Sequence, residues 1–241
     1  MSCSLVRPGA LLSTRRIPAA RPRSQRTLVS PGAGHGQGPL QELLALRPED
    51  ISEDGSVNFD QLERLLEFHV ENGTDAILTL GTTGESATMT DDEDNSVVAA
   101  VVKHVAGRVP VIAGSGSNST QTMLTKSLTY QGLGADGLLL ITPYYNKSNE
   151  EGIYQHFKTV ADAVDIPCIL YNVPGRTGCS IPVSVVERLA KHPNIAGIKE
   201  ASGDMSYAMK IARCAGPDFA LYSGNDDITV PIPVSYTHLT L

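Results

Sequence analysis

A lysine ends an apolar segment that is typical of a buried β-strand. Lys199 directly follows the run Ile-Ala-Gly-Ile at positions 195–198. An ammonium group in apolar surroundings is costly unless it is paired or neutral, so a lysine at this position needs a chemical reason. Lys199 is therefore either an ion-pair partner, for which Glu200 is the nearest candidate, or a neutral amine nucleophile of the kind that forms Schiff bases.

Two other groups of polar residues also begin where an apolar run stops. One is Gly-Thr-Thr-Gly-Glu-Ser at 81–86, and the other is Tyr-Asn-Val-Pro-Gly-Arg-Thr at 171–177. The carboxyl ends of parallel strands meet at one edge of a sheet. We therefore expect both motifs to share one active-site rim with Lys199.

Helix and strand patterns alternate from residue 58 onward. Asn58 is a candidate N-cap for a helix that Gly73 ends, and Thr90 with Glu93 is a capping box before the next helix. The same periodicity predicts further helices over 122–130, 151–163, 183–191 and 206–215. The predicted strands end near residues 81, 114, 142, 172, 199 and 223, at intervals typical of single βα units.

Two α/β architectures have this repeat, a doubly wound parallel sheet and the TIM (β/α)8 barrel. A doubly wound dinucleotide-binding fold concentrates its signal in one glycine-rich first turn, and no Gly-x-Gly-x-x-Gly follows the first predicted strand. Polar residues instead follow at least four different strands, which favours the rim of a barrel. A short turn explains Gly114-Ser115-Gly116 better than a phosphate site does.

The composition argues against several classes of partner. The 241 residues carry a net charge of −7, which disfavours binding to nucleic acid or anionic membranes through bulk charge. No apolar stretch approaches the roughly 20 residues that span a bilayer, and the four cysteines lack metal-binding spacing. We therefore expect small-molecule partners and a reducing, cytoplasmic location.

The two ends differ from the rest of the chain. Residues 1–41 contain six arginines and no acidic residue, a composition of a transit peptide, a disordered extension or an out-of-frame translation. Residues 233–241 show no periodicity. We expect one partial-barrel catalytic domain over 42–232, between an atypical N-terminal extension and an unrelated tail.

From about Asp54 to Ile232 the chain resembles the dihydrodipicolinate synthase family of pyruvate-dependent class I aldolases, which are TIM barrels. The resemblance covers about three quarters of the sequence. It rests on five motifs in the family's order and spacing: GTTGES at 81–86, TPYYN at 142–146, YNVPGRT at 171–177, IKEASGD at 198–204 and SGND at 223–226.

The resemblance implies a reaction and a role for each catalytic residue. Lys199 would form an imine with the ketone of pyruvate. Tyr171 would shuttle protons, hydrogen-bonded through Thr82 to Tyr145 of a neighbouring subunit. Tyr144 is adjacent to Tyr145, and their assignment could be exchanged. The pyruvate enamine would then add to aspartate 4-semialdehyde, as in lysine and diaminopimelate biosynthesis, in a homodimer or homotetramer.

The resemblance also assigns the substrate-binding residues. Thr83 and backbone N–H groups of the GTTGE turn would hold the pyruvate carboxylate. Arg176 would bind the carboxylate of the aldehyde substrate, because guanidinium matches carboxylate bidentately. Gly224 of the SGND motif would line the same site. The family's chemistry requires neither a metal nor an organic cofactor, since the imine on lysine is the electron sink.

The sequence departs from the family's pattern in three places. Leu-Arg-Pro-Glu at 46–49 replaces the Thr-Pro step that ends the first strand, and the tail replaces the eighth strand and the C-terminal helical region. The acidic segment 90–94 lacks the histidine common in lysine-inhibited members. About seven strands are therefore expected. The alternatives are a truncated, non-catalytic fragment and a relative that uses another aldehyde.

Overall fold

The computed structural model describes residues 41–42, 52 and 55–225, which form one curved parallel sheet with helices on its outer side. The sheet has seven strands in the order β1 to β7, with β1 and β7 at its two edges. The strands are β1 (Gln41–Glu42), β2 (Ile77–Thr79), β3 (Val111–Gly114), β4 (Gly137–Ile141), β5 (Cys168–Asn172), β6 (Ile195–Glu200) and β7 (Ala220–Ser223).

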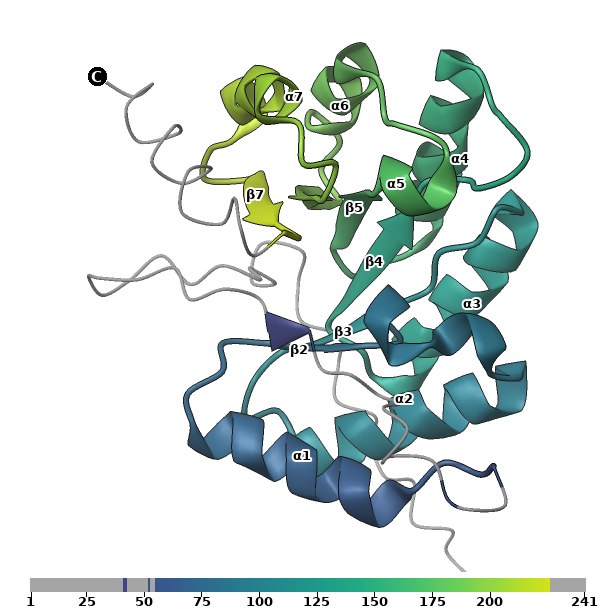
Figure 1. Ribbon diagram of the computed structural model, residues 1–241, viewed down its shortest axis with the longest axis vertical. Helices are drawn as coiled ribbons and strands as arrows, with labels where there is room; N and C mark the ends of the chain where they lie inside the picture. Colours follow the sequence, from purple (N-terminus) through teal and green to yellow (C-terminus); the bar gives the residue numbers. More distant parts are fainter. Residues whose placement is uncertain (1–40, 43–51, 53–54, 226–241) are drawn as a thin grey trace, which may run out of the picture.

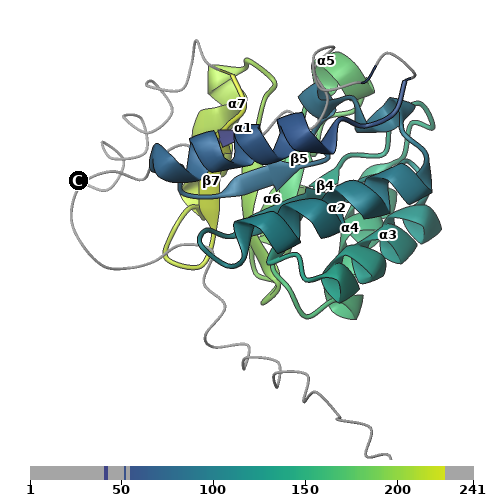
Figure 2. The ribbon, with the colours of Figure 1, turned by 90° about the horizontal axis from the view of Figure 1, so that it is seen from below.

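The helices lie between successive strands and cover the convex face of the sheet (Figures 1 and 2). Three 3-10 turns accompany them, at Thr82–Gly84, Ser86–Thr88 and Ala212–Cys214. The α-helices are α1 (Phe59–Glu71), α2 (Asp91–Val105), α3 (Thr120–Leu133), α4 (Glu150–Ala163), α5 (Pro174–Thr177), α6 (Val183–Leu189) and α7 (Met205–Ile211). This partial (β/α) barrel confirms the predicted fold class, and the described residues contain seven strands.

The predicted helix starts are present in the structure. The Asn58 side chain accepts a hydrogen bond from the Gln61 N–H at 3.1 Å, and Thr90 with Glu93 forms a complete capping box at α2. The predicted helix over 206–215 is shorter, because α7 ends at Ile211 and the chain tightens into a 3-10 turn. The predicted helix is thus present, but its last turn is 3-10 and not α-helical.

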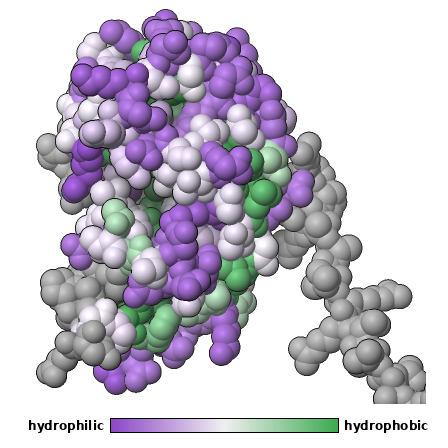
Figure 3. Space-filling model, turned by 90° about the vertical axis from the view of Figure 1, so that its right-hand side faces the viewer, coloured by the Kyte–Doolittle hydropathy of each residue, from purple (hydrophilic) through white to green (hydrophobic). Residues whose placement is uncertain are grey.

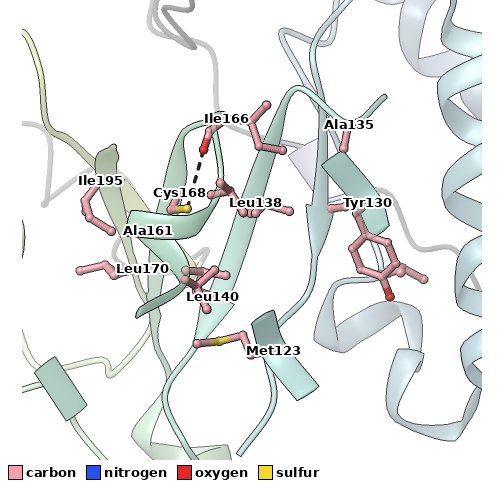
Figure 4. Close-up of a cluster of buried hydrophobic side chains, with 14 of the residues drawn as sticks. Met123, Tyr130, Ala135, Leu138, Leu140, Ala161, Ile166, Cys168, Leu170 and Ile195 are labelled. Carbon is pink, nitrogen blue, oxygen red and sulfur yellow. Dashed lines mark hydrogen bonds between the residues drawn. The ribbon is translucent and has the colours of Figure 1, made fainter. Parts of the chain in front are cut away.

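Alternation along the strands separates two cores. The inner one lies on the concave face of the sheet and consists of Ala76, Leu78, Ile112, Leu139, Ile169, Tyr171 and Val173. The larger, outer one packs the convex face against the helices, as Figure 4 shows for Leu138 and Leu140 of β4, Leu170 of β5 and Met123 of α3. Strands buried on both faces are nearly continuously apolar, which makes any polar residue in them informative.

Close backbone contacts explain the glycines of the predicted turn after β3. A Cβ atom at Gly114 would lie 2.2 Å from the carbonyl oxygen of Leu80, and one at Gly116 would lie 2.5 Å from Cγ2 of Ile141. Leu80 itself is buried and has a φ of 57°, in the left-handed region. These glycines therefore serve close packing of neighbouring strand ends, in agreement with the turn interpretation.

The outer surface over the helices is mainly hydrophilic. Figure 3 views the right-hand side of Figure 1 and shows hydrophobic side chains only in separate smaller patches. Within the described residues, no helix combines the length and the apolar character needed to cross a membrane.

Candidate active site

Lys199 and Tyr171 are neighbours at the C-terminal ends of β6 and β5. They are paired across the parallel ladder, and the Lys199 Nζ lies 4.8 Å from the centre of the Tyr171 ring. Both side chains face the inner core and are nearly buried, at 8% and 6% exposure. Glu200 points to the opposite face, as alternation along β6 predicts. The structure thus brings together the two residues that the sequence placed at the centre of the site.

A small cavity borders the lysine inside the barrel. It measures about 20 Å³, room for about one water molecule. Its wall is mostly aliphatic and comes from six strands, β2 to β7, with Leu78, Ile112, Leu139, Ile169, Lys199, Tyr222 and Ser223 as lining residues. Leu78 of β2 lies four positions before Thr82 in the chain, so the GTTGES turn follows a strand that lines the same cavity as Lys199. Burial raises the pKa of the Tyr222 phenol, which keeps it neutral.

Gly224 packs directly on the lysine side chain. A Cβ atom at this position would lie 3.1 Å from Cε of Lys199 and 2.7 Å from Cβ of Ala201. The Gly224 N–H donates to the carbonyl oxygen of Glu200 at 2.6 Å, which holds the backbone in this place. The absence of a side chain at Gly224 therefore leaves the space that the Lys199 chain occupies.

The GTTGES turn follows β2 as a pair of 3-10 turns joined at Glu85, whose φ is 53°. The N–H groups of Gly84 and Glu85 donate to the carbonyl oxygens of Gly81 and Thr82 within the turn. Two N–H groups of the turn are therefore engaged internally. The first N–H groups of a 3-10 turn have no acceptor within it, which leaves those of Thr82 and Thr83.

Arg176 lies on α5, a four-residue helix after β5. Its side chain is exposed, and no ion pair involves it within the described part of the chain. Thr177 anchors the helix from below, with its hydroxyl donating to the carbonyl oxygens of Val173 and Cys179. The guanidinium therefore stands at the rim on a short, fixed element.

Tyr145 lies apart from Lys199 within one chain. It is 92% exposed, it follows β4, and its φ of 73° is unusual for a non-glycine residue. Its neighbour Tyr144 is 40% exposed. The single chain brings together Lys199, Tyr171 and Gly224, whereas Tyr145 points to the surroundings.

Sequence reasoning did not identify the polar layer on the outer side of β5 and β6. Asn172 and Glu200 are fully buried and paired across the ladder, with the Asn172 Nδ2 donating to the Glu200 Oε2 at 2.8 Å. Burial raises the pKa of the Glu200 carboxyl, partly opposed by its hydrogen bonds from Ser202 and Asn172. The signal in the sequence was two consecutive polar residues at the end of each of these apolar strands, Tyr171 with Asn172 and Lys199 with Glu200. Only one residue of each pair can face the cavity, so the other must be buried on the outer face.

Comparison with known proteins places the chain in a family. Residues 45–234 match the dihydrodipicolinate synthetase family. The chain is 47% identical to the 4-hydroxy-tetrahydrodipicolinate synthase of Neisseria meningitidis serogroup B over 199 residues, which are 83% of this chain and 68% of the relative. It is 52% identical to that of Methylococcus capsulatus over 187 residues, which are 78% of this chain and 64% of the relative.

Solved structures show the same fold. The dihydrodipicolinate synthase of Aquifex aeolicus has a TM-score of 0.78 at 43% identity, over 83% of this chain and 67% of that one. The enzyme of Acinetobacter baumannii, solved with pyruvate, has a TM-score of 0.75 at 42% identity, over 77% and 64%. The chain thus spans about two thirds of the length of these relatives. The family predicted from the five motifs is confirmed: the chain belongs to the dihydrodipicolinate synthetase family.

Proposed function

We propose that this chain carries the 4-hydroxy-tetrahydrodipicolinate synthase reaction, the condensation of pyruvate with L-aspartate 4-semialdehyde through an imine on Lys199. The observation that carries the proposal is a nearly buried lysine at a barrel strand end, 4.8 Å from the ring of Tyr171. TIM-barrel enzymes place their chemistry at this end of the strands. The sequence identity of 47% and 52% to two 4-hydroxy-tetrahydrodipicolinate synthases supports the same assignment.

In the proposed reaction Lys199 attacks the pyruvate ketone as a neutral amine and loses water to give the imine. A proton then leaves the methyl carbon, and the enamine carbon forms a bond to the aldehyde carbon, whose oxygen becomes a hydroxyl. The amino group of the second substrate finally attacks the imine carbon and releases the lysine. The ring closure conserves all atoms, with one water lost overall.

Tyr171 is the proposed proton shuttle for these steps. A phenol both donates and accepts a hydrogen bond, and this one lies beside the lysine where protons must enter and leave. Thr82 would connect it to a second phenol, for which we propose Tyr145 of a neighbouring copy. The 92% exposure of Tyr145 supports a role outside its own chain. The proposed enzyme is accordingly a cytoplasmic homodimer or homotetramer.

Two separate groups would hold the two substrate carboxylates. Thr83, with the N–H groups of Thr82 and Thr83, would bind that of pyruvate, because neighbouring N–H donors attract anions. Arg176 would bind that of the semialdehyde in bidentate geometry. Its position on the rim rather than in the cavity supports the second substrate as its partner. Gly224 would keep the imine site open.

Reductive trapping tests the proposal directly. The chain is incubated with pyruvate and borohydride, and its intact mass is measured. A single adduct of about 72 Da at Lys199 is expected, since reduction fixes the imine as a secondary amine. Lys199→Ala removes the nucleophile, and Lys210→Ala, at an exposed lysine on α7, is the matched control.

An adduct that persists in Lys199→Ala, or a folded parent chain without any adduct, would contradict the proposal. The second substrate is tested next. Aspartate 4-semialdehyde is added to the pyruvate-loaded protein, and the return of Lys199 to its unmodified amine is followed. In Arg176→Lys the semialdehyde should release the Lys199 amine less effectively, while the pyruvate adduct stays unchanged. The reason is that a single ammonium group cannot replace the planar guanidinium in bidentate binding of a carboxylate.

A further inference from the structure

A buried polar network ties the two catalytic strand ends together on the side away from the substrate. Asn172 and Glu200 directly follow Tyr171 and Lys199 in the sequence, so alternation turns them to the outer face of the sheet. Both are fully buried. Polar groups in such a place must find partners, and the partners of these two lie on several segments around the site.

The Glu200 carboxylate joins β5 to the loop after β6. Its Oε2 accepts from the Asn172 Nδ2 at 2.8 Å, and its Oε1 accepts from the Ser202 N–H at 2.6 Å. Two donors on two different segments therefore converge on one carboxylate. Each carboxyl oxygen thus has its own donor, which fixes the end of β5 relative to the loop after β6.

The Asn172 amide extends the junction to the segment that follows α5. Its Oδ1 accepts from the Ile181 N–H at 2.9 Å. The Ile181 carbonyl oxygen in turn accepts from the Tyr207 hydroxyl on α7 at 2.7 Å. Only one orientation of the amide satisfies both neighbours, with nitrogen toward the carboxylate and oxygen toward the N–H. The network thus spans β5, β6, the segment that follows α5, and α7.

This arrangement is expensive if its only purpose is stability. A buried carboxylate must be desolvated, and an apolar pair of similar volume would fill the same space without that cost. The polar pair adds specificity, because its directional hydrogen bonds fix the register of β5 against β6 at their last residues. The side chains that depend on that register are Tyr171 and Lys199.

We propose that Asn172 and Glu200 are positioning residues that hold Lys199 at the angle and distance from which it attacks the bound ketone. This inference rests on the proposed function for its catalytic part. A misplacement of about 1 Å can cost on the order of 100-fold in rate, so a loosened register should be visible in imine formation.

Exchanging the two functional groups is the sharpest test. In Glu200→Gln, the new amide nitrogen must face either the Ser202 N–H or the Asn172 amide nitrogen. Both of these are donors, so one hydrogen bond is lost in either orientation. In Asn172→Asp, two carboxylates face each other. The double variant Asn172→Asp with Glu200→Gln restores every donor and acceptor pair with the charge moved by one strand, since the new carboxylate accepts from Ile181 N–H and from the new amide.

The rate of borohydride-trapped imine formation at saturating pyruvate is the functional readout. We expect it to fall about tenfold or more in each single variant and to return to within about threefold of the parent in the double variant. Val98→Ala, at a fully buried α2 position, is the control for lost stability alone. It should lower the melting temperature and leave the imine rate of the folded protein unchanged.

Amide hydrogen exchange of the ligand-free protein reports the positioning itself. The Ala201 N–H donates to the Asn172 carbonyl at 2.9 Å, and the Gly224 N–H donates to that of Glu200, so both bridge strand ends without using the network's side chains. Their protection should fall in the single variants and recover in the double one. If a single variant does not fold, the comparison of the double variant with the parent decides.

Several outcomes would overturn the inference. They are unchanged imine rates in the folded single variants, rates that only follow the melting temperature as in Val98→Ala, and a double variant no better than either single one. A parent chain that forms no imine would contradict the proposed function instead. In that case exchange at Ala201 and Gly224 still decides whether the pair positions the strand ends, and unchanged protection refutes it.

Discussion

The Lys199 amine lies 4.8 Å from the centre of the Tyr171 ring, and the two residues are direct partners across β5 and β6. The face of the ring, which carries partial negative charge, lies against the lysine amine, whereas the proposed proton transfer uses the hydroxyl at the edge of the ring. In the proposed reaction one side chain therefore combines a packing role and a chemical role. Conservative substitutions can separate the two.

Tyr171→Phe keeps the ring beside Lys199 and removes the hydroxyl. We expect turnover to fall by about 10²- to 10³-fold, the usual contribution of a general acid–base group, with little change in melting temperature. The small stability effect follows because no hydrogen bond of this hydroxyl occurs among the described residues. Tyr154→Phe, whose ring on α4 packs under Arg188, is the matched control and should leave both quantities unchanged. Parent-level turnover in Tyr171→Phe would refute the shuttle role.

Gly224→Ala introduces a methyl group where Lys199 and Ala201 already lie. The new Cβ would be 2.7 Å from the Ala201 Cβ and 3.1 Å from the Lys199 Cε, so the lysine chain must shift. We expect imine formation to slow about tenfold and the free energy of unfolding to fall by about 1–3 kcal/mol. Trapping with borohydride and urea unfolding measure the two effects.

The control for this substitution is Gly132→Ala on α3, where nothing lies within 4 Å of the added Cβ. Alanine in a helix is better than glycine by about 0.5–1 kcal/mol, so this variant should be slightly more stable than the parent and equally reactive. Equal imine rates in the two glycine variants would show that Gly224 has no influence on the lysine.

Local signals in the sequence were sufficient for most of the fold. Asn58, Thr90 and Glu93 indicate where their helices begin, because their side chains form hydrogen bonds to the backbone three residues away. No tertiary information is needed to recognise them. The strands of the sheet are recognisable because apolar runs on both faces require burial. The same runs ended at polar motifs, and those ends form the rim of the barrel.

Features set by tertiary packing were beyond the reach of such signals. The four-residue helix α5 and the 3-10 turns of the GTTGES segment are too short to show a period. The left-handed backbone of Leu80 and Tyr145 has no signal in the sequence, because neither residue type favours it. The bulge between Cys168 and Ile169 that brings Tyr171 opposite Lys199 depends on the pairing of two strands.

Thr90→Ala tests the capping box at the start of α2. The Thr90 hydroxyl accepts from the Glu93 N–H at 3.3 Å, and the Glu93 carboxylate accepts from the Thr90 N–H at 2.8 Å. Loss of the cap should lower the free energy of unfolding by about 1 kcal/mol, which a urea titration resolves. Thr129→Ala is the control, because its exposed hydroxyl bonds only to the Thr125 carbonyl within α3, and we expect almost no change there. A loss in both variants of equal size would contradict the capping argument.

The histidine buried between α4 and the start of α3 should make stability depend on pH. His156 is 4% exposed, its Nδ1 lies 2.8 Å from the Thr120 hydroxyl, and its buried Nε2 has no hydrogen-bond partner among the residues that the structure describes. Burial lowers the pKa of its imidazole to about 4 from the ordinary value of 6.5. The folded protein therefore holds this group neutral over a range in which the unfolded chain protonates it.

The direction of the effect follows from that difference. Between pH 6.5 and about 4 the unfolded chain binds more protons than the folded one at this position, so stability falls as the pH falls through this window. From pH 7.5 to pH 5 the contribution of His156 is about 1–2 kcal/mol. His156→Asn, which keeps a polar partner for Thr120, should remove that part of the loss in urea unfolding at the two pH values. His192→Asn is the control, because His192 is partly exposed and lies 2.9 Å from the exposed Asp162 carboxylate instead of in the core. If the parent and His156→Asn lose the same free energy between the two pH values, the acid sensitivity comes from other groups and the buried imidazole does not contribute to it.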